Sequence, residues 1–192
     1  MLIDRKKAIA YMVFLVAGLV VFISIKWFLR VRGVNLTALT EKRQLIAELS
    51  ETIIPRTDTA GAKDAHVADF IIAMVTYGLS KPEQWTFLIG LEDVDRFCVS
   101  RLGQNFISCS AIQRTEVLRF FEESEWTSFR VAQKIRNKLF GRSFFNLLKW
   151  LTAIGYCSSE VGATEALIYD YLPDVYKGCI QLEAGQSAWA IK

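Results

Sequence analysis

The sequence predicts an all-α protein: an N-terminal transmembrane helix followed by one compact domain of about five to six helices with an irregular C-terminal tail. The first observation is an apolar run of 18 residues near the N-terminus that carries no charge. Beyond this run, apolar residues recur at the three- and four-residue spacing of amphipathic helices. No segment alternates apolar and polar residues over the length of a strand. We therefore expect a membrane segment at residues 1–32 and a helical domain at residues 33–192.

The apolar run, residues 8–25, is expected to cross a membrane. At a rise of ~1.5 Å per residue, a helix of this length spans ~27 Å, close to the ~30 Å hydrocarbon core of a bilayer. Three basic residues flank each end of the run, so the positive-inside count leaves the orientation open. No small-residue cleavage site follows the run. This favours an uncleaved anchor, with a cleaved signal peptide as the alternative.

The excess of basic residues belongs to the N-terminal segment alone. Residues 1–32 hold six basic residues and one acidic residue, whereas residues 33–192 hold 17 basic and 19 acidic residues. The domain therefore has a mildly acidic balance, which is the opposite of the positive surface that nucleic-acid phosphates require. We expect no nucleic-acid partner.

The helices of the domain are expected in order after a polar linker at residues 33–40. Pro55 ends the first helix, because the residue before a proline is disfavoured in the α region. Pro82 suits the first turn of a later helix, and Gly103 ends that helix. Ser110-x-x-Gln113 is a capping-box pattern that opens the next one. The expected helices are residues 41–54, 66–79, 82–102, 111–125, 129–154 (with Gly141 as a candidate break) and 160–172, followed by the tail at residues 173–192.

The sequence contains no recognisable catalytic motif. Its single histidine, His66, is expected at a helix start, and a metal site needs three or four convergent ligands. The glycine-rich nucleotide-binding, H-E-x-x-H and C-x-x-C-H patterns are missing. We therefore expect no catalytic, cofactor-binding or metal-binding residue in this chain, and an independent hydrolase is disfavoured.

Four cysteines, Cys98, Cys109, Cys157 and Cys179, match no zinc-binding spacing. In a domain outside the cytoplasm, an even number of cysteines favours disulfides, and three pairings are possible. Cys98 lies near the end of one expected helix and Cys109 just before the next, while Cys179 would fasten the tail to Cys157. We expect Cys98–Cys109 and Cys157–Cys179 bonds. Four free thiols in a cytosolic domain are the alternative.

Two segments carry a family resemblance. They are residues 51–71 (ETIIPRTDTAGAKDAHVADFI) and residues 155–182 (GYCSSEVGATEALIYDYLPDVYKGCIQL), of which the second contains a Y-K-G-C motif and is followed by Trp189. In this order they resemble the gluconate 2-dehydrogenase subunit 3 family over most of residues 40–190. The chain departs from the family pattern at Ala60, where proline is usual. It also lacks the glycine that usually follows Pro173.

The resemblance implies a non-catalytic small subunit of a membrane-associated sugar or polyol dehydrogenase. In such complexes the large subunit is a glucose-methanol-choline type flavoprotein that binds FAD, and a cytochrome c subunit with haem c often accepts the electrons. The small subunit is expected to support folding, export or membrane attachment of the flavoprotein. The resemblance also implies a single-pass protein of the inner membrane with its domain in the periplasm. A stand-alone membrane-anchored helical adaptor or secretion chaperone is the alternative.

We expect the partner to contact the loop after the first helix of the domain and the aromatic C-terminal part. Polar and glycine residues of the loop suit tight turns and backbone hydrogen bonds, and aromatic side chains are enriched at interfaces. In both regions a purely internal role is the alternative. The candidate interface residues are Thr57, Asp58, Thr59, Gly61, Tyr156, Tyr169, Tyr176 and Trp189.

Overall fold

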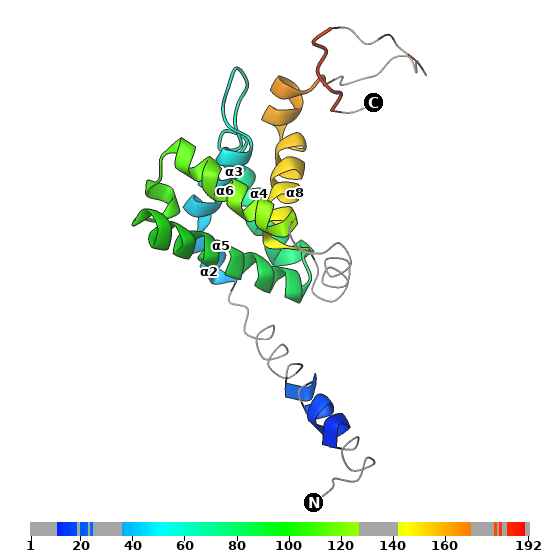
Figure 1. Cartoon of the computed structure of the whole chain (residues 1–192). Helices are drawn as coiled ribbons and strands as arrows, with labels where there is room; N and C mark the ends of the chain where they lie inside the picture. Colours follow the sequence, from blue (N-terminus) through cyan, green and yellow to red (C-terminus); the bar gives the residue numbers. More distant parts are fainter. Residues whose placement is uncertain are drawn as a thin grey trace, which may run out of the picture. The chain divides into compact units, whose positions relative to one another are not determined.

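A computed structural model of the 192-residue chain divides into two compact units, Met1–Asn35 and Leu36–Lys192. The structure describes residues 11–18, 20–22, 24, 36–126, 142–169, 179, 181 and 184–190 (Figure 1). In these residues all regular secondary structure is helical, apart from one isolated parallel β-bridge between Ile168 and Trp189. The all-α prediction is therefore confirmed.

The first unit contains the described part of the apolar run, residues 11–18, 20–22 and 24, which is helical. Its large apolar side chains are exposed, from 55% for Val20 to 78% for Phe14. Within the described residues, no helix combines the length and the apolar character that a membrane crossing requires. Residues 8–10, 19, 23 and 25 of the expected span lie outside the described part of the chain.

The second unit is a helical domain. Short π-helices (η1 and η3) and one 3-10 helix (η2) stand between or after its α-helices. The elements in chain order are α2 (Thr37–Glu41), α3 (Arg43–Ile53), α4 (Val67–Ala73), η1 (Met74–Gly78), α5 (Lys81–Leu102), η2 (Phe106–Ser108), α6 (Ala111–Trp126), α8 (Phe144–Cys157) and η3 (Gly162–Ala166).

The helix boundaries follow from local chemistry that the sequence shows. α5 begins with a capping box in which the Ser80 N–H donates to Glu83 Oε2 at 3.2 Å, and it ends at Gly103, whose φ of 71° is left-handed. α6 also begins with a capping box, because the Ser110 N–H donates to Gln113 Oε1 at 2.9 Å. These predicted boundaries are confirmed, as is the end of α3 before Pro55.

The last predicted helix, residues 160–172, is confirmed only in its first part. Residues 170–172 lie outside the described residues. Residues 160–166 are helical and end in the π-helical turn Gly162–Ala166, whereas Leu167 is already extended with a ψ of 164°. The reason is pairing with the C-terminal segment: the Ile168 N–H donates to the Ala188 carbonyl, and the Ala190 N–H donates to the Ile168 carbonyl, both at 2.9 Å. Tertiary hydrogen bonds therefore override the helical pattern of the sequence.

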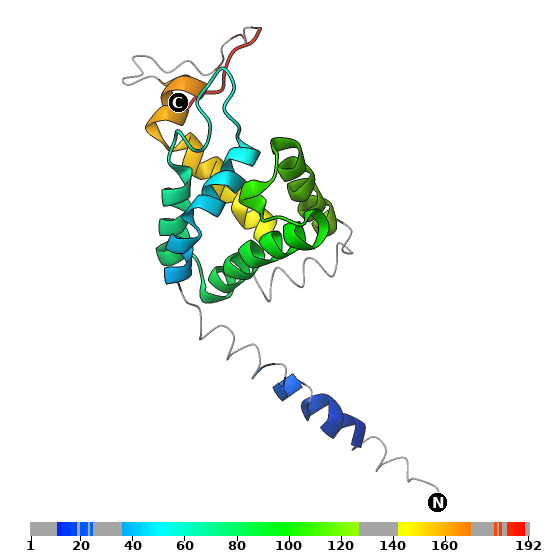
Figure 2. The same cartoon turned by 90° about the vertical axis from the view of Figure 1, so that its left-hand side faces the viewer.

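The core of the domain is built around α8, which contacts α3, α4, α5 and α6 (Figure 2). Leu147, Leu148 and Leu151 of this helix are fully buried. At the crossing of α5 and α8, a Cβ atom on Gly90 would lie 2.0 Å from Phe144 Cγ. Only glycine therefore permits this close approach of the two helices. The C-terminal end of α8 and the α3–α4 loop, residues 54–66, lie at the same end of the domain (Figure 2).

Candidate functional site

Two distant segments meet at Ala60, in the loop between α3 and α4. The Tyr156 hydroxyl, from the end of α8, donates to the Ala60 carbonyl oxygen at 2.6 Å. The Ala60 N–H donates to Glu165 Oε2, from η3, at 3.3 Å. A proline at this position would have no N–H for the second bond. We call this region the loop face: it comprises loop residues 55–60, residues 154–169 and the C-terminal residues Trp189 and Ala190.

Carboxylates hold the base of the loop. Glu51 accepts hydrogen bonds from the Arg56 N–H at 3.0 Å and from the Lys63 N–H at 2.8 Å. Asp64 accepts one from the Gly61 N–H at 3.0 Å. A Cβ atom on Gly61 would lie 2.6 Å from Glu51 Oε1, so glycine is needed where the chain passes this carboxylate. The loop therefore has a defined conformation although its residues 55–58 are exposed.

A partly buried ion-pair network fastens this base to the rest of the domain. Glu48 accepts from the Lys63 ammonium at 2.6 Å and from the Arg114 guanidinium on α6. Arg114 also donates to the carbonyl of Ile107 at 2.6 Å. The Glu48 and Arg114 side chains are only 12% and 19% exposed. Each charge has lost most of its hydration, and the opposite charge of the other offsets this cost. The network links α3, the loop, η2 and α6.

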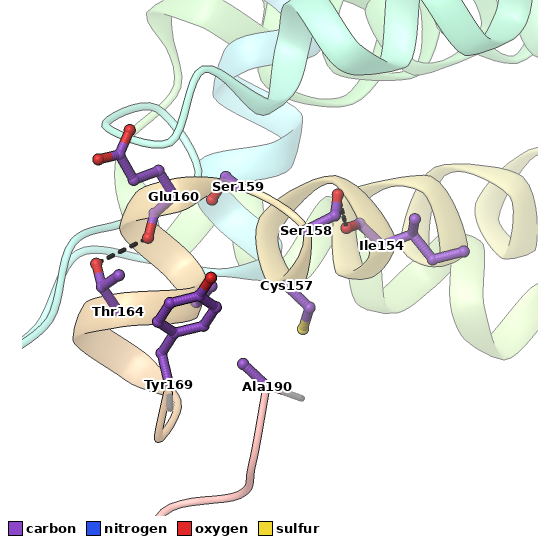
Figure 3. Close-up of a pocket in the computed structure, with 9 residues that line it drawn as sticks. Ile154, Cys157, Ser158, Ser159, Glu160, Thr164, Tyr169 and Ala190 are labelled. Carbon is purple, nitrogen blue, oxygen red and sulfur yellow. Dashed lines mark hydrogen bonds between the residues drawn. The ribbon is translucent and has the colours of Figure 1, made fainter. Parts of the chain in front are cut away.

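A pocket of about 910 Å³ opens where the end of α8 and η3 face the C-terminal residue Ala190 (Figure 3). The serine and threonine hydroxyls that line it are turned to their own helical backbone: Ser158 Oγ donates to the Ile154 carbonyl at 2.7 Å, and Thr164 Oγ1 donates to the Glu160 carbonyl at 2.8 Å. The surface left for a ligand is therefore mainly apolar, which suits a protein side chain better than a polar metabolite. The lining residues are Ile154, Cys157, Ser158, Ser159, Glu160, Ala163, Thr164, Tyr169 and Ala190.

The structure divides the predicted interface residues into exposed and internal ones. Thr57 and Asp58 are exposed and Thr59 is half-buried at the loop tip. Tyr169 and Trp189 are 42% and 38% exposed. Gly61 and Tyr156, in contrast, are buried. The Gly61 N–H and the Tyr156 hydroxyl both donate hydrogen bonds within the domain. Tyr176 lies outside the described residues.

Sequence reasoning did not identify the residues that fix the loop. Glu51, Asp64 and Glu165 hold its backbone, yet no local pattern marks them. The bond between Glu165 and Ala60 joins residues 105 positions apart, so only the fold brings them together. Their presence inside the two segments of the family resemblance was the available signal.

His66 is the N-cap residue of α4. Its φ of 49° lies in the left-handed region, and the residue is exposed. Its neighbour Asp69 instead accepts two hydrogen bonds from Arg43, at 2.6 and 2.7 Å. These bonds hold the pKa of Asp69 below its usual range. Within the described residues, no group of three or more histidine, cysteine or acidic side chains is placed to hold a metal ion.

The expected disulfides are absent: Cys98, Cys109, Cys157 and Cys179 are all free thiols. Cys98 and Cys109 do meet in the core, where the Cys109 thiol donates to the Asn105 carbonyl at 3.4 Å. Burial, followed by the neighbouring Cys109, raises the pKa of Cys98 to about 12. Thiol–disulfide exchange requires a thiolate, so the Cys98 thiol is unreactive in the folded domain. Cys157 lines the open pocket and Cys179 is exposed.

Comparison with known proteins identifies the family. No curated protein and no solved structure matches the chain. The family model described as gluconate 2-dehydrogenase subunit 3 matches residues 40–173, which is more than half of the chain and includes the loop, α8 and η3. This chain therefore belongs to the gluconate 2-dehydrogenase subunit 3 family.

Proposed function

We propose that this chain is a non-catalytic accessory subunit of a membrane-associated, FAD-dependent sugar or polyol dehydrogenase. Its partner is the glucose-methanol-choline type flavoprotein that oxidises the substrate, and a cytochrome c subunit with haem c accepts the electrons. The family match over residues 40–173 carries the proposal. The small subunit supports the folding, export or membrane attachment of the flavoprotein.

The loop face supports a role in binding a protein. It combines exposed polar residues, Thr57 and Asp58, with an apolar pocket and the partly exposed rings of Tyr169 and Trp189. Partly exposed aromatic side chains beside polar groups are typical of protein interfaces. We assign FAD to the flavoprotein, because a dinucleotide site of the Rossmann type is built on a strand–turn–helix unit. The described residues contain no strand beyond the single bridge.

The first unit supports attachment to the membrane. The large apolar side chains of residues 11–16 and 20–22 are more than half exposed, and basic residues flank the apolar run on both sides. A bilayer would cover such a helix, and basic flanks suit the interfacial region. We place the helical domain in the periplasm, on the side where the flavoprotein works.

Deletion of this chain tests the proposal. Membranes of a strain that lacks the chain should lose sugar or polyol dehydrogenase activity, and expression of the full chain in trans should restore it. Immunodetection of the flavoprotein in the membrane, periplasmic and cytoplasmic fractions then shows which step fails. Unchanged activity and unchanged location of the flavoprotein in the deletion strain would contradict the proposal. A client that is exported normally but purifies without this chain would favour the adaptor or secretion chaperone.

A further inference from the structure

The C-terminal segment, residues 184–190, pairs with a single residue that follows η3. The Ile168 N–H donates to the Ala188 carbonyl oxygen, and the Ala190 N–H donates to the Ile168 carbonyl oxygen, both at 2.9 Å. Ile168 and Trp189 form a parallel bridge, so this is the pairing of neighbouring strands reduced to one residue on each side. Ile168 therefore presents a short strand edge, and the end of the same chain covers it.

The C-terminal segment also contributes to the pocket. Ala190 lines one side, and the other described lining residues lie between Ile154 and Tyr169. Figure 3 shows the Cys157 side chain pointing from α8 toward the side on which Ala190 and Tyr169 lie. Ala190 places only a methyl group there, and about 910 Å³ of the pocket stays open. A larger apolar side chain in the place of Ala190 would find room in the pocket and an apolar surface to contact.

The C-terminal segment is weakly held compared with the core. Ala184, Gly185, Ser187 and Ala188 are exposed, and Trp189 is 38% exposed. Segments that bury few side chains open much more often than the core of a domain. The covalent tether works against this opening, because it keeps the segment near its site at an effective concentration on the order of millimolar. A free segment therefore displaces it at a similar concentration, or at a lower one if the free segment binds more tightly.

We propose that the strand edge at Ile168 and the pocket together bind an extended polypeptide segment, and that residues 186–190 of this chain occupy the site as a displaceable strap. An extended backbone that runs parallel to residues 167–169 replaces both hydrogen bonds of Ile168, as in strand addition to a sheet edge. A competing segment with a large apolar side chain in the place of Ala190 also fills the pocket and therefore binds more tightly than the strap. The proposal concerns this site alone and does not depend on the accessory function.

The first measurement compares two leucine substitutions by hydrogen exchange of the full-length chain in detergent. Ala190→Leu places its side chain in the pocket, so exchange of the Ile168 amide should slow at least about fivefold through the added apolar burial. Alkylation of Cys157 should slow as well, measured with Cys179→Ser in the background to remove the other exposed thiol. Ala188→Leu is the matched control, because Ala188 is exposed and does not line the pocket. Equal rates in the two leucine variants would overturn the role of the pocket.

The second measurement asks whether a free segment takes the place of the strap. Ala190→Pro removes the N–H that bonds Ile168, so exchange of the Ile168 amide should speed up about five- to tenfold while α8 keeps its protection. An amidated peptide of residues 184–190 at millimolar concentration should restore slow exchange. The same peptide with Ala190→Leu should do so at a lower concentration, and with Ala190→Pro it should have no effect.

Two outcomes of the peptide experiment would contradict the proposal. Unchanged exchange in the Ala190→Pro chain would show that the strap does not cover Ile168. Faster exchange that no peptide reverses would show that the edge and the pocket do not bind a polypeptide segment. Neither outcome bears on the accessory function, which co-purification with the flavoprotein tests separately.

Discussion

Glu48 connects α3, on which it lies, to the α3–α4 loop and to α6 through its charge. Its carboxylate binds Lys63 and Arg114. Glu48→Ala should lower the free energy of unfolding by about 3 kcal/mol, because it leaves the largely buried Arg114 guanidinium without its counter-charge. The exposed pair of Arg96 and Asp93 provides the control, and Asp93→Ala should change stability by less than about 1 kcal/mol. Urea unfolding followed by circular dichroism measures both. Equal effects of the two substitutions would contradict this role of Glu48.

The four thiols should differ in reactivity according to their burial. Iodoacetamide at pH 8 should label Cys157 and Cys179, which are exposed, and spare Cys98 and Cys109, which are buried. All four should be labelled after unfolding without reductant. Peptide mass spectrometry identifies the labelled residues. A Cys98–Cys109 pair that stays unlabelled in the unfolded chain until reductant is added would show a disulfide and contradict the free-thiol structure.

The Cys98 thiol also predicts a pH dependence. Its pKa of about 12 in the folded domain lies above the value of about 8.5 of a free cysteine. Because folding favours the protonated thiol, its contribution to stability is complete below about pH 8.5 and is lost as the pH rises towards 12. Cys98→Ala should therefore flatten the decline of stability over this range. Chemical unfolding curves of the two proteins between pH 8 and pH 11 measure the difference; parallel declines would contradict it.

At the scale of elements, the crossing of α5 and α8 depends on a glycine. A Cβ atom on Gly90 would lie 2.0 Å from Phe144 Cγ, inside the core. Gly90→Ala should therefore destabilise the domain by about 1–3 kcal/mol through overpacking. Combining it with Phe144→Leu should recover part of the loss, which a double-mutant cycle detects as a coupling energy. Additive effects of the two substitutions would mean that the helices do not cross at this point.

Local signals in the sequence were sufficient for most helix ends. The capping boxes at Ser80 and Ser110 and the stop at Gly103 satisfy backbone groups within a few residues, so the sequence displays them directly. The extended segment after Ala166 was not predictable in this way. Its conformation is set by hydrogen bonds of Ile168 to Ala188 and Ala190, twenty or more residues away. The same holds for the loop face. The composition of residues 56–61 indicated a tight loop, but no local pattern predicted that Tyr156 and Glu165 hydrogen-bond the backbone of Ala60.

At the scale of the whole molecule, the two units have different surfaces. The described part of the first unit exposes nearly all its large apolar side chains, whereas the second unit has one buried apolar core. We predict that the full chain stays in the membrane fraction after carbonate extraction and that a chain lacking residues 1–35 is released. A reporter active only in the periplasm, fused after Lys192, should be active. A mature N-terminus near residue 30 would contradict the anchor, and an inactive reporter would contradict the orientation.

The central claim is that this chain is a lasting subunit of a dehydrogenase complex, and co-purification tests it most directly. The tagged full-length chain is purified from detergent-solubilised membranes, followed by size-exclusion chromatography with detection of flavin absorbance. We predict one peak in which the chain co-elutes with a flavoprotein, contains FAD and oxidises a sugar or polyol with an artificial electron acceptor. Elution of the chain alone, while flavoprotein and activity migrate elsewhere, would contradict the account.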